Sequence, residues 1–94
     1  MNLADIVISV GHEFGLTLEA NPSTGYLWHE YFDTNVLRLV EKSYLATRGV
    51  EKPGFTCYTF KALTAGESSI AFEYKRPWEN APEKEFTVGV RVEE

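Results

Sequence analysis

Few side chains in this sequence could support nucleophilic catalysis or bind a metal. The chain has a single thiol, Cys57, and two imidazoles, His12 and His29. A catalytic nucleophile needs a base within hydrogen-bond reach, and paired histidine ligands usually recur at a short fixed spacing. The two histidines lie in different segments, and Cys57 lies in an expected strand, where a free cysteine is usually a small core or sheet-face residue. We therefore predict no enzyme activity, no bound metal and no cofactor.

The charged residues also argue against several functions. The net charge is −5, with 9 basic and 14 acidic residues, and the longest basic run is Lys75-Arg76. Nucleic-acid-binding domains usually carry a basic patch, so we expect no nucleic-acid partner. No apolar run is long enough to span a membrane, and no basic segment precedes the first apolar stretch, so we predict neither membrane insertion nor a signal peptide. These features fit either an intracellular protein or a mature form whose leader has been removed.

One polar segment has the composition of a rigid turn. It consists of Asn21, Pro22, Ser23, Thr24, Gly25 and Tyr26. Pro22 fixes its own φ at about −65°, the Asn21 side chain can hydrogen-bond the backbone two residues on, and Gly25 can adopt a positive φ. We expect the hydroxyl groups of Ser23 and Thr24 at the tip. On turn chemistry alone, an ordinary connection between two strands is the more common explanation.

A second segment places an indole between two expected strands. Residues 76–80 read Arg-Pro-Trp-Glu-Asn, so Trp78 follows a proline and precedes a polar stretch. Trp and Arg are enriched at the energetic centres of protein interfaces, which favours a binding loop. In the alternative interpretation, Trp78 folds back to cover the end of the domain, because Trp is a mostly buried residue.

The elements that position these segments are short strands. Apolar residues recur with period two, which is typical of half-buried strands, over segments 6–10, 14–18, 27–31, 55–62, 70–75 and 86–92. Turn signals lie between them at 11–13, 21–25, 53–54, 64–67 and 76–82. Residues 34–46 fit a helical stripe or a strand, and we favour a strand because the neighbouring segments are strands. Strands and turns at this spacing predict an all-β sandwich in one domain, residues 1–94.

Taken together, the two polar segments resemble the signature motifs of a known family. The first reads Asn-Pro-Ser-Thr-Gly-Tyr-Leu-Trp over residues 21–28, and the second reads Arg-Pro-Trp over residues 76–78. In this order and at this spacing they are similar to the motifs of chagasin-type inhibitors of papain-like cysteine proteases. The resemblance implies an immunoglobulin-like β-sandwich with Greek-key connections and three binding loops at one end.

The resemblance also implies a function and a partner. An inhibitor of this type binds reversibly and tightly, and it fills the active-site cleft of the protease with the loops 21–26, 49–55 and 76–80. Thr24 would face the catalytic Cys and His of the protease, and Trp78 would pack on the primed side of the cleft. The implied partner is a papain-like enzyme, papain or a cathepsin L-type protease. We expect a monomer when free, although the final strand could offer an edge for pairing.

The middle loop departs from the family pattern. The family usually carries Gly-x-Gly-Gly there, whereas this chain reads Glu-Lys-Pro-Gly-Phe over residues 51–55. Only Gly54 clearly corresponds, Pro53 removes one backbone donor, and Gly49 could belong to a longer version of the loop. The residues that the resemblance implies for protease binding are Asn21, Pro22, Ser23, Thr24, Gly25, Tyr26, Pro53, Gly54, Phe55, Arg76, Pro77 and Trp78.

Two other functions compete with inhibition. A non-inhibitory immunoglobulin-like module could bind a carbohydrate or a protein, with Trp78 stacked on a sugar ring. A sugar platform would need two or three aromatic residues on one face, and it would leave the 21–26 turn unexplained. A purely structural domain predicts no effect on any protease. Trp28 has a separate role in all three interpretations, because we expect it in the core.

Overall fold

A computed structural model describes residues 4–47 and 53–94 of the 94-residue chain. Within these residues the chain forms strands and a single 3₁₀ turn, joined by brief connections. The elements are β1 (Ile6–Ser9), β2 (Glu13–Ala20), η1 (Pro22–Thr24), β3 (Leu27–Phe32), β4 (Leu37–Leu45), β5 (Gly54–Ala62), β6 (Gly66–Lys75) and β7 (Lys84–Glu93).

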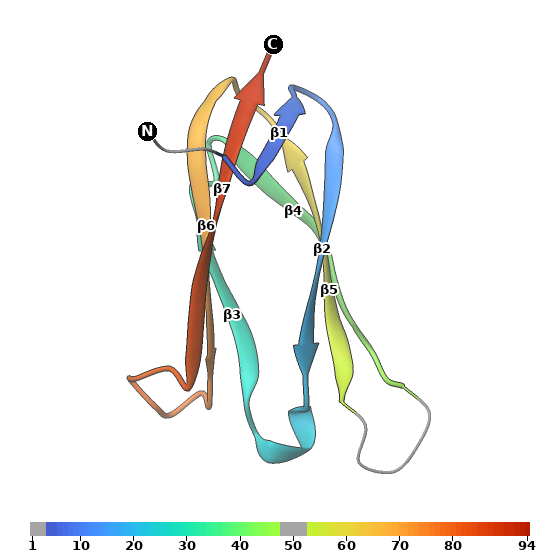
Figure 1. The fold of residues 1–94 in the computed structure, drawn as a ribbon, viewed down its shortest axis with the longest axis vertical. Coiled ribbons are helices and arrows are strands. Elements are labelled where there is room, and N and C mark those ends of the chain that lie inside the picture. Colours follow the sequence, from blue (N-terminus) through green and yellow to red (C-terminus); the bar gives the residue numbers. More distant parts are fainter. Residues whose placement is uncertain (1–3, 48–52) are drawn as a thin grey trace.

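The strands form two sheets that pack face to face (Figure 1). One sheet has the strand order β1-β7-β6-β3, and the other has the order β2-β5-β4. Consecutive strands pair as β4–β5 and β6–β7, whereas the chain changes sheet at β1–β2, β2–β3, β3–β4 and β5–β6. These crossings give the Greek-key arrangement of an immunoglobulin-like sandwich, so the predicted fold is confirmed.

Alternating burial along the strands explains why these segments form a sandwich. In β5 every second residue from Gly54 to Ala62 is buried, and the residues between them are partly exposed. This pattern turns one face of a strand toward the core and the other toward solvent. The core between the sheets is rich in aromatic side chains, which provide large apolar burial. Its largest fully buried members are Tyr58, Phe60, Phe72, Leu37, Ile70 and Val90.

The ambiguous segment 34–46 is a turn followed by a strand. The Asp33 carbonyl accepts hydrogen bonds from the backbone amides of Val36 and Leu37, which closes the turn. From Leu37 onward the chain pairs with β5, so the prediction of a strand is confirmed. Leu37 is fully buried, and sheet pairing with core burial outweighs the weak helical periodicity of the segment.

Two expectations about the last strands are wrong in part. The predicted turn at 64–67 is shorter, because Gly66 and Glu67 already pair with Val92 and Arg91 of β7. The end of β7 is also not an open edge, because β1 pairs with it in parallel along its last four residues. This part of the final strand therefore cannot offer that edge to a second chain.

A carboxylate between the sheets links them by hydrogen bonds. Glu30 Oε1 accepts a hydrogen bond from the Tyr58 hydroxyl at 3.0 Å and another from Lys42 Nζ at 2.8 Å. Lys42 Nζ also donates to the Trp28 carbonyl at 2.9 Å. The Glu30 side chain is only 17% exposed, so water screens these interactions in part. The network joins β3 of one sheet to β4 and β5 of the other.

The substitution Glu30→Gln tests this link, because it keeps the shape of the side chain and removes its charge. We expect the free energy of unfolding to fall by about 1–2 kcal/mol, since hydrogen bonds to a partly buried charge weaken. Glu67→Gln makes the same change in the exposed pair with Arg91, where the Glu67 side chain is 72% exposed. For Glu67→Gln we expect the free energy of unfolding to change by no more than about 0.5 kcal/mol. Urea unfolding of both variants checks the prediction, and equal losses would contradict it.

Alkaline pH tests the environment of Tyr58. Burial between the sheets, together with the Glu30 carboxylate, raises the pKa of Tyr58 above its ordinary value of 10.0. Above that pH the unfolded chain releases the Tyr58 proton while the folded chain keeps it, so the free energy of unfolding falls as pH rises. Between about pH 10 and about pH 11 the wild type should lose about 1 kcal/mol more than Tyr58→Phe. Urea unfolding at the two pH values measures this difference, and the same loss in both proteins would show the prediction to be wrong.

Candidate functional site

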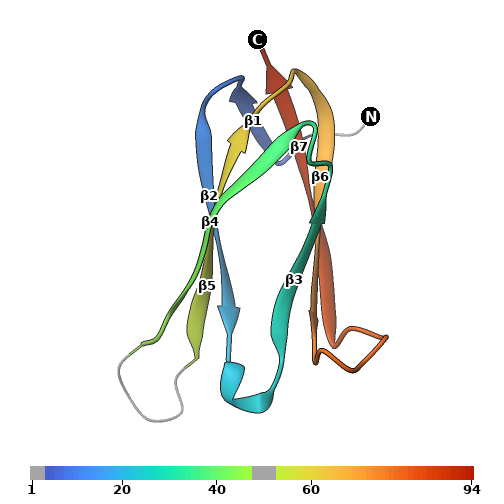
Figure 2. The ribbon, with the colours of Figure 1, turned by 180° about the vertical axis from the view of Figure 1, so that it is seen from behind.

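Three connections between strands begin and end at one end of the sandwich, opposite the end that holds the C-terminus (Figures 1 and 2). They are the connections β2–β3, β4–β5 and β6–β7. In both views the β2–β3 connection lies between the ends of the other two strand pairs. The expected loops 21–26 and 76–80 are therefore neighbours in space, whereas residues 48–52 of the middle connection lie outside the described residues.

Residues 21–26 form a tight turn around the 3₁₀ helix η1. The Asn21 carbonyl accepts hydrogen bonds from the Thr24 amide at 3.2 Å and the Thr24 hydroxyl at 2.8 Å. The Ser23 hydroxyl donates to Asn21 Oδ1 at 2.6 Å. The sequence predicts a hydrogen bond from the Asn21 side chain to the backbone, whereas the Asn21 side chain instead accepts this bond from the Ser23 side chain. Gly25 has a φ of 87°, which confirms its predicted conformation. Both hydroxyl groups thus donate their hydrogen bonds within the turn.

Tyr74 of β6 anchors this turn to the core. Its hydroxyl accepts a hydrogen bond from the Asn21 amide at 3.0 Å. Its ring packs on Trp28 with 4.8 Å between centroids and stacks on Tyr26 with 5.4 Å between centroids. Trp28 is buried, as predicted, and its Nε1 donates to the Glu19 carbonyl at 2.9 Å. Buried aromatic side chains therefore hold both ends of the turn.

Tyr74 is a site residue that the sequence analysis missed. In the sequence it is one member of the alternating segment 70–75, with the same spacing as any inward-facing strand residue. Its position two residues before Arg76 is the signal that would have placed it near the binding end. Its hydrogen-bond partner, Asn21, lies 53 residues away along the chain, and no sequence pattern pairs the two.

Residues 76–79 form a second compact turn, which presents Trp78. The Glu79 amide donates to the Arg76 carbonyl at 3.0 Å, and the Arg76 amide donates to Glu79 Oε1 at 3.3 Å. Trp78 is 72% exposed, so the interpretation in which it covers the end of the sandwich is wrong. An exposed indole on a hydrogen-bonded turn is typical of a surface that binds another protein.

The two turns contact each other through Arg76. Its Nε donates to the Thr24 carbonyl at 3.3 Å. Its guanidinium carbon lies 4.6 Å from the centroid of the Tyr26 ring and 5.9 Å from the Trp78 ring. A β-carbon at Gly25 would lie 3.7 Å from Arg76 Nε and 3.8 Å from the Trp78 ring, so both side chains pack close to this glycine. The first and third expected loops therefore form one continuous surface.

The middle connection is described only at its base. The Thr47 hydroxyl donates to the Pro53 carbonyl at 2.7 Å, which links the two sides of the connection. Gly54 and Phe55 belong to β5, and Gly54 is buried. They are therefore strand residues next to the loop, whereas the family resemblance predicts them within it. Three further positions expected in this loop, Gly49, Glu51 and Lys52, lie outside the described residues.

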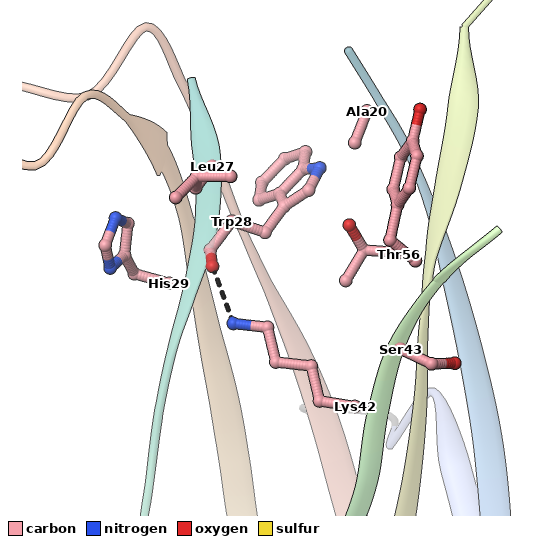
Figure 3. A pocket seen from close by; sticks show the side chains of 8 residues that line it. Ala20, Leu27, Trp28, His29, Lys42, Ser43 and Thr56 are labelled. Carbon is pink, nitrogen blue, oxygen red and sulfur yellow. Dashed lines mark hydrogen bonds between the residues drawn. The ribbon is translucent and has the colours of Figure 1, made fainter. Parts of the chain in front are cut away.

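A pocket of about 330 Å³ opens between the sheets beside this end (Figure 3). The Trp28 indole points into the pocket from β3, and the His29 ring lies on the other side of that strand. Lys42 reaches across from β4 to the Trp28 carbonyl, which is the interaction that links the two sheets here. The pocket therefore lies between residues of the two sheets, next to the hydrogen bond from Lys42 to the Trp28 carbonyl.

The histidines and the cysteine occupy the positions that the sequence predicts. His12 follows the turn after β1, His29 lies in β3, and Cys57 lies on a face of β5 in the other sheet. In residues 4–47 and 53–94 no three His, Cys, Asp or Glu side chains are grouped so that they could hold a metal ion. In the same part of the chain, no helix has the length and apolar character needed to cross a membrane.

The two sheets and the crossings between them make this chain an immunoglobulin-like β-sandwich, with a closed turn and an exposed Trp at one end. The family model described as chagasin family peptidase inhibitor I42 matches residues 7–90. The match covers nearly all of the sequence, including both signature motifs. The chain belongs to the chagasin family of peptidase inhibitors.

Two solved structures are similar to the chain over most of its length. The cysteine protease inhibitor EhICP2 from Entamoeba histolytica has 26% sequence identity and a TM-score of 0.83, over 95% of this chain and 88% of that chain. The solution structure of amebosin has 30% identity and a TM-score of 0.72, over 94% of this chain and 87% of that chain. No curated protein matches the sequence significantly.

The substitution Gly54→Ala tests how tightly the base of the middle loop is packed. A β-carbon at Gly54 would collide with the Leu45 carbonyl and the Tyr44 side chain, so β4 and β5 would have to separate there. We expect the free energy of unfolding to fall by about 2 kcal/mol. Gly15→Ala is the matched control, because its β-carbon would meet only an ordinary contact at 3.6 Å. Thermal unfolding of both variants checks the prediction, and equal melting temperatures would contradict it.

Proposed function

We propose that this chain inhibits papain-like cysteine proteases reversibly and tightly by filling the active-site cleft with its loop end. The observation that carries the proposal is the contact between the turns 21–26 and 76–79 through Arg76, which forms one surface with Trp78 exposed on it. Membership of the chagasin family supports this function, as does the likeness to EhICP2, which is named a cysteine protease inhibitor. We propose that the loop 49–55 contributes on its own side of the cleft.

The shape of the 21–26 turn supports inhibition without cleavage. A protease attacks a peptide carbonyl that is held in an extended, correctly oriented segment. Here residues 22–24 form a 3₁₀ turn, and Gly25 ends it with a positive φ. A segment of this shape can occupy a cleft without placing a carbonyl where a substrate would place it. The hydrogen bonds within the turn also reduce the ordering cost of binding.

The Thr24 hydroxyl has a fixed hydrogen-bond polarity toward a partner, because it already donates a bond within the turn. A hydroxyl group has one proton to donate and lone pairs that accept. The Thr24 proton is already donated to the Asn21 carbonyl, so the exposed Thr24 oxygen acts toward a partner only as an acceptor. A protonated histidine is a suitable donor for it. This polarity supports the proposal that Thr24 faces the catalytic Cys and His of the protease.

Trp78 is the proposed anchor on the primed side of the cleft. It is the most exposed large hydrophobic side chain in the described part of the molecule. Burial of an indole against an apolar surface is among the largest single contributions to protein association. We expect an interface of ordinary size, about 800 Å² per partner, formed by a monomer of this chain. The site residues implied by the family resemblance remain proposed contacts.

Titration into papain and a cathepsin L-type protease, with a fluorogenic substrate, tests the function. We expect nanomolar inhibition by the wild type. Trp78→Ala should weaken it about 30-fold or more, since truncation of such an anchor removes about 2 kcal/mol. Thr24→Ala should weaken it about fivefold, because it removes the hydroxyl that closes the turn. Val7→Ala, at an exposed position in β1, is the control and should inhibit like the wild type.

Dilution of the preformed complex completes this test. We expect protease activity to return on dilution and the released chain to remain intact by mass spectrometry. A folded wild-type chain that inhibits neither enzyme would refute the proposed function. Cleavage within residues 21–26 would refute the explanation based on the shape of the turn.

A further inference from the structure

We propose that Arg76 is a positioning residue, which acts on the protease through Trp78 and not by a contact of its own. The proposal rests on the proposed inhibitory function and assigns a role within the same site. Arg76 holds the indole against the 21–26 turn, so that the two turns enter the cleft as one rigid body.

Several contacts within the chain hold Arg76 in place. Its Nε donates to the Thr24 carbonyl at 3.3 Å, which ties the guanidinium group to the tip of the first turn. The guanidinium group also lies over the Tyr26 ring, with 4.6 Å from its carbon to the ring centroid, and within 5.9 Å of the Trp78 ring centroid. The Arg76 amide and carbonyl are both bonded to Glu79, so the backbone of the residue is held as well.

Exposure separates the roles of the two neighbouring side chains. Arg76 is partly buried, whereas Trp78 is 72% exposed. Both side chains lie against Gly25, because a β-carbon there would meet Arg76 Nε at 3.7 Å and the Trp78 ring at 3.8 Å, which are ordinary van der Waals contacts. An exposed indole on a turn would ordinarily sample several rotamers, and ordering them on binding weakens association. The guanidinium group restricts that freedom before the partner arrives.

Arginine suits this role for a physical reason. Its planar guanidinium group stacks on aromatic rings and donates hydrogen bonds in the same plane, whereas a lysine ammonium is a compact, strongly hydrated charge. Arg76→Lys therefore keeps the charge and removes the stacking platform. A role in long-range attraction to the protease would survive this substitution, and a positioning role would not.

A double-mutant cycle in inhibition assays tests the proposal. We expect Arg76→Ala to weaken inhibition about tenfold. Arg76→Lys should also weaken inhibition, and the logarithm of its inhibition constant should lie closer to that of Arg76→Ala than to that of the wild type. In a Trp78→Ala background, Arg76→Ala should weaken inhibition by threefold or less, because its target is already absent. An undiminished tenfold loss in that background would overturn the proposal, and so would full rescue by lysine. Arg38→Ala, at an exposed arginine near the other end of the sandwich, is the control and should inhibit like the wild type.

A measurement on the free protein tests the same contact without any protease. The Trp78 ring lies close enough to Gly25 to shift the NMR resonances of the Gly25 α-protons. We expect Arg76→Ala to move these resonances toward ordinary glycine values and Arg38→Ala to leave them unchanged. Unchanged Gly25 resonances in Arg76→Ala would overturn the positioning role. A wild type that shows the Gly25 shift but inhibits no protease would refute the proposed function alone.

Discussion

A continuous series of aromatic and cation–π contacts connects the core of this protein to its loop end. Trp28 lies in the core, Tyr74 packs on it, and Tyr26 stacks on Tyr74. Arg76 lies over Tyr26 and approaches Trp78, the exposed end of the series. Tyr74 is the essential member, because it contacts the core indole through its ring and the first turn through its hydroxyl. The position of the exposed indole is therefore set by packing that begins inside the sandwich, and the rigidity of the loop end follows from it.

The link between the sheets complements this aromatic series. A pocket lined by Trp28 and Lys42, among others, opens between the sheets near the loop end. Lys42 and Glu30 bridge the two sheets just beside this opening. The third loop joins two strands of the β1-β7-β6-β3 sheet, the middle loop joins two strands of the other sheet, and the first loop crosses from β2 to β3. A bridge between the sheets therefore constrains how far apart the bases of these loops lie. A polar link is well suited to the task, because its geometry is directional whereas apolar packing tolerates sliding.

The proposed inhibition follows from rigidity and not from reactive chemistry. A flexible loop that entered a protease cleft would adopt an extended form and be cleaved, and it would also lose entropy on binding. In this chain the turn at 21–26 is closed by its own hydroxyl groups and by Arg76, so it remains compact without a disulfide. The chain has one cysteine, so intrachain hydrogen bonds and aromatic packing provide this rigidity.

The sequence by itself determined the strands, the core position of Trp28 and the positive φ of Gly25, because periodicity and turn chemistry are local properties of the chain. The motif pair also predicted the loops 21–26 and 76–80 as the binding loops, which is the basis of the proposed site. The exposure of Trp78 required the tertiary structure, since its sequence fitted a covering role as well as a binding role. The contact between Tyr74 and Asn21 also required the tertiary structure, because it joins residues 53 positions apart and no sequence pattern indicates it. Local patterns fix which elements form, whereas contacts between distant residues depend on how the sheets pack, and that packing alone joins two separate loops into one surface.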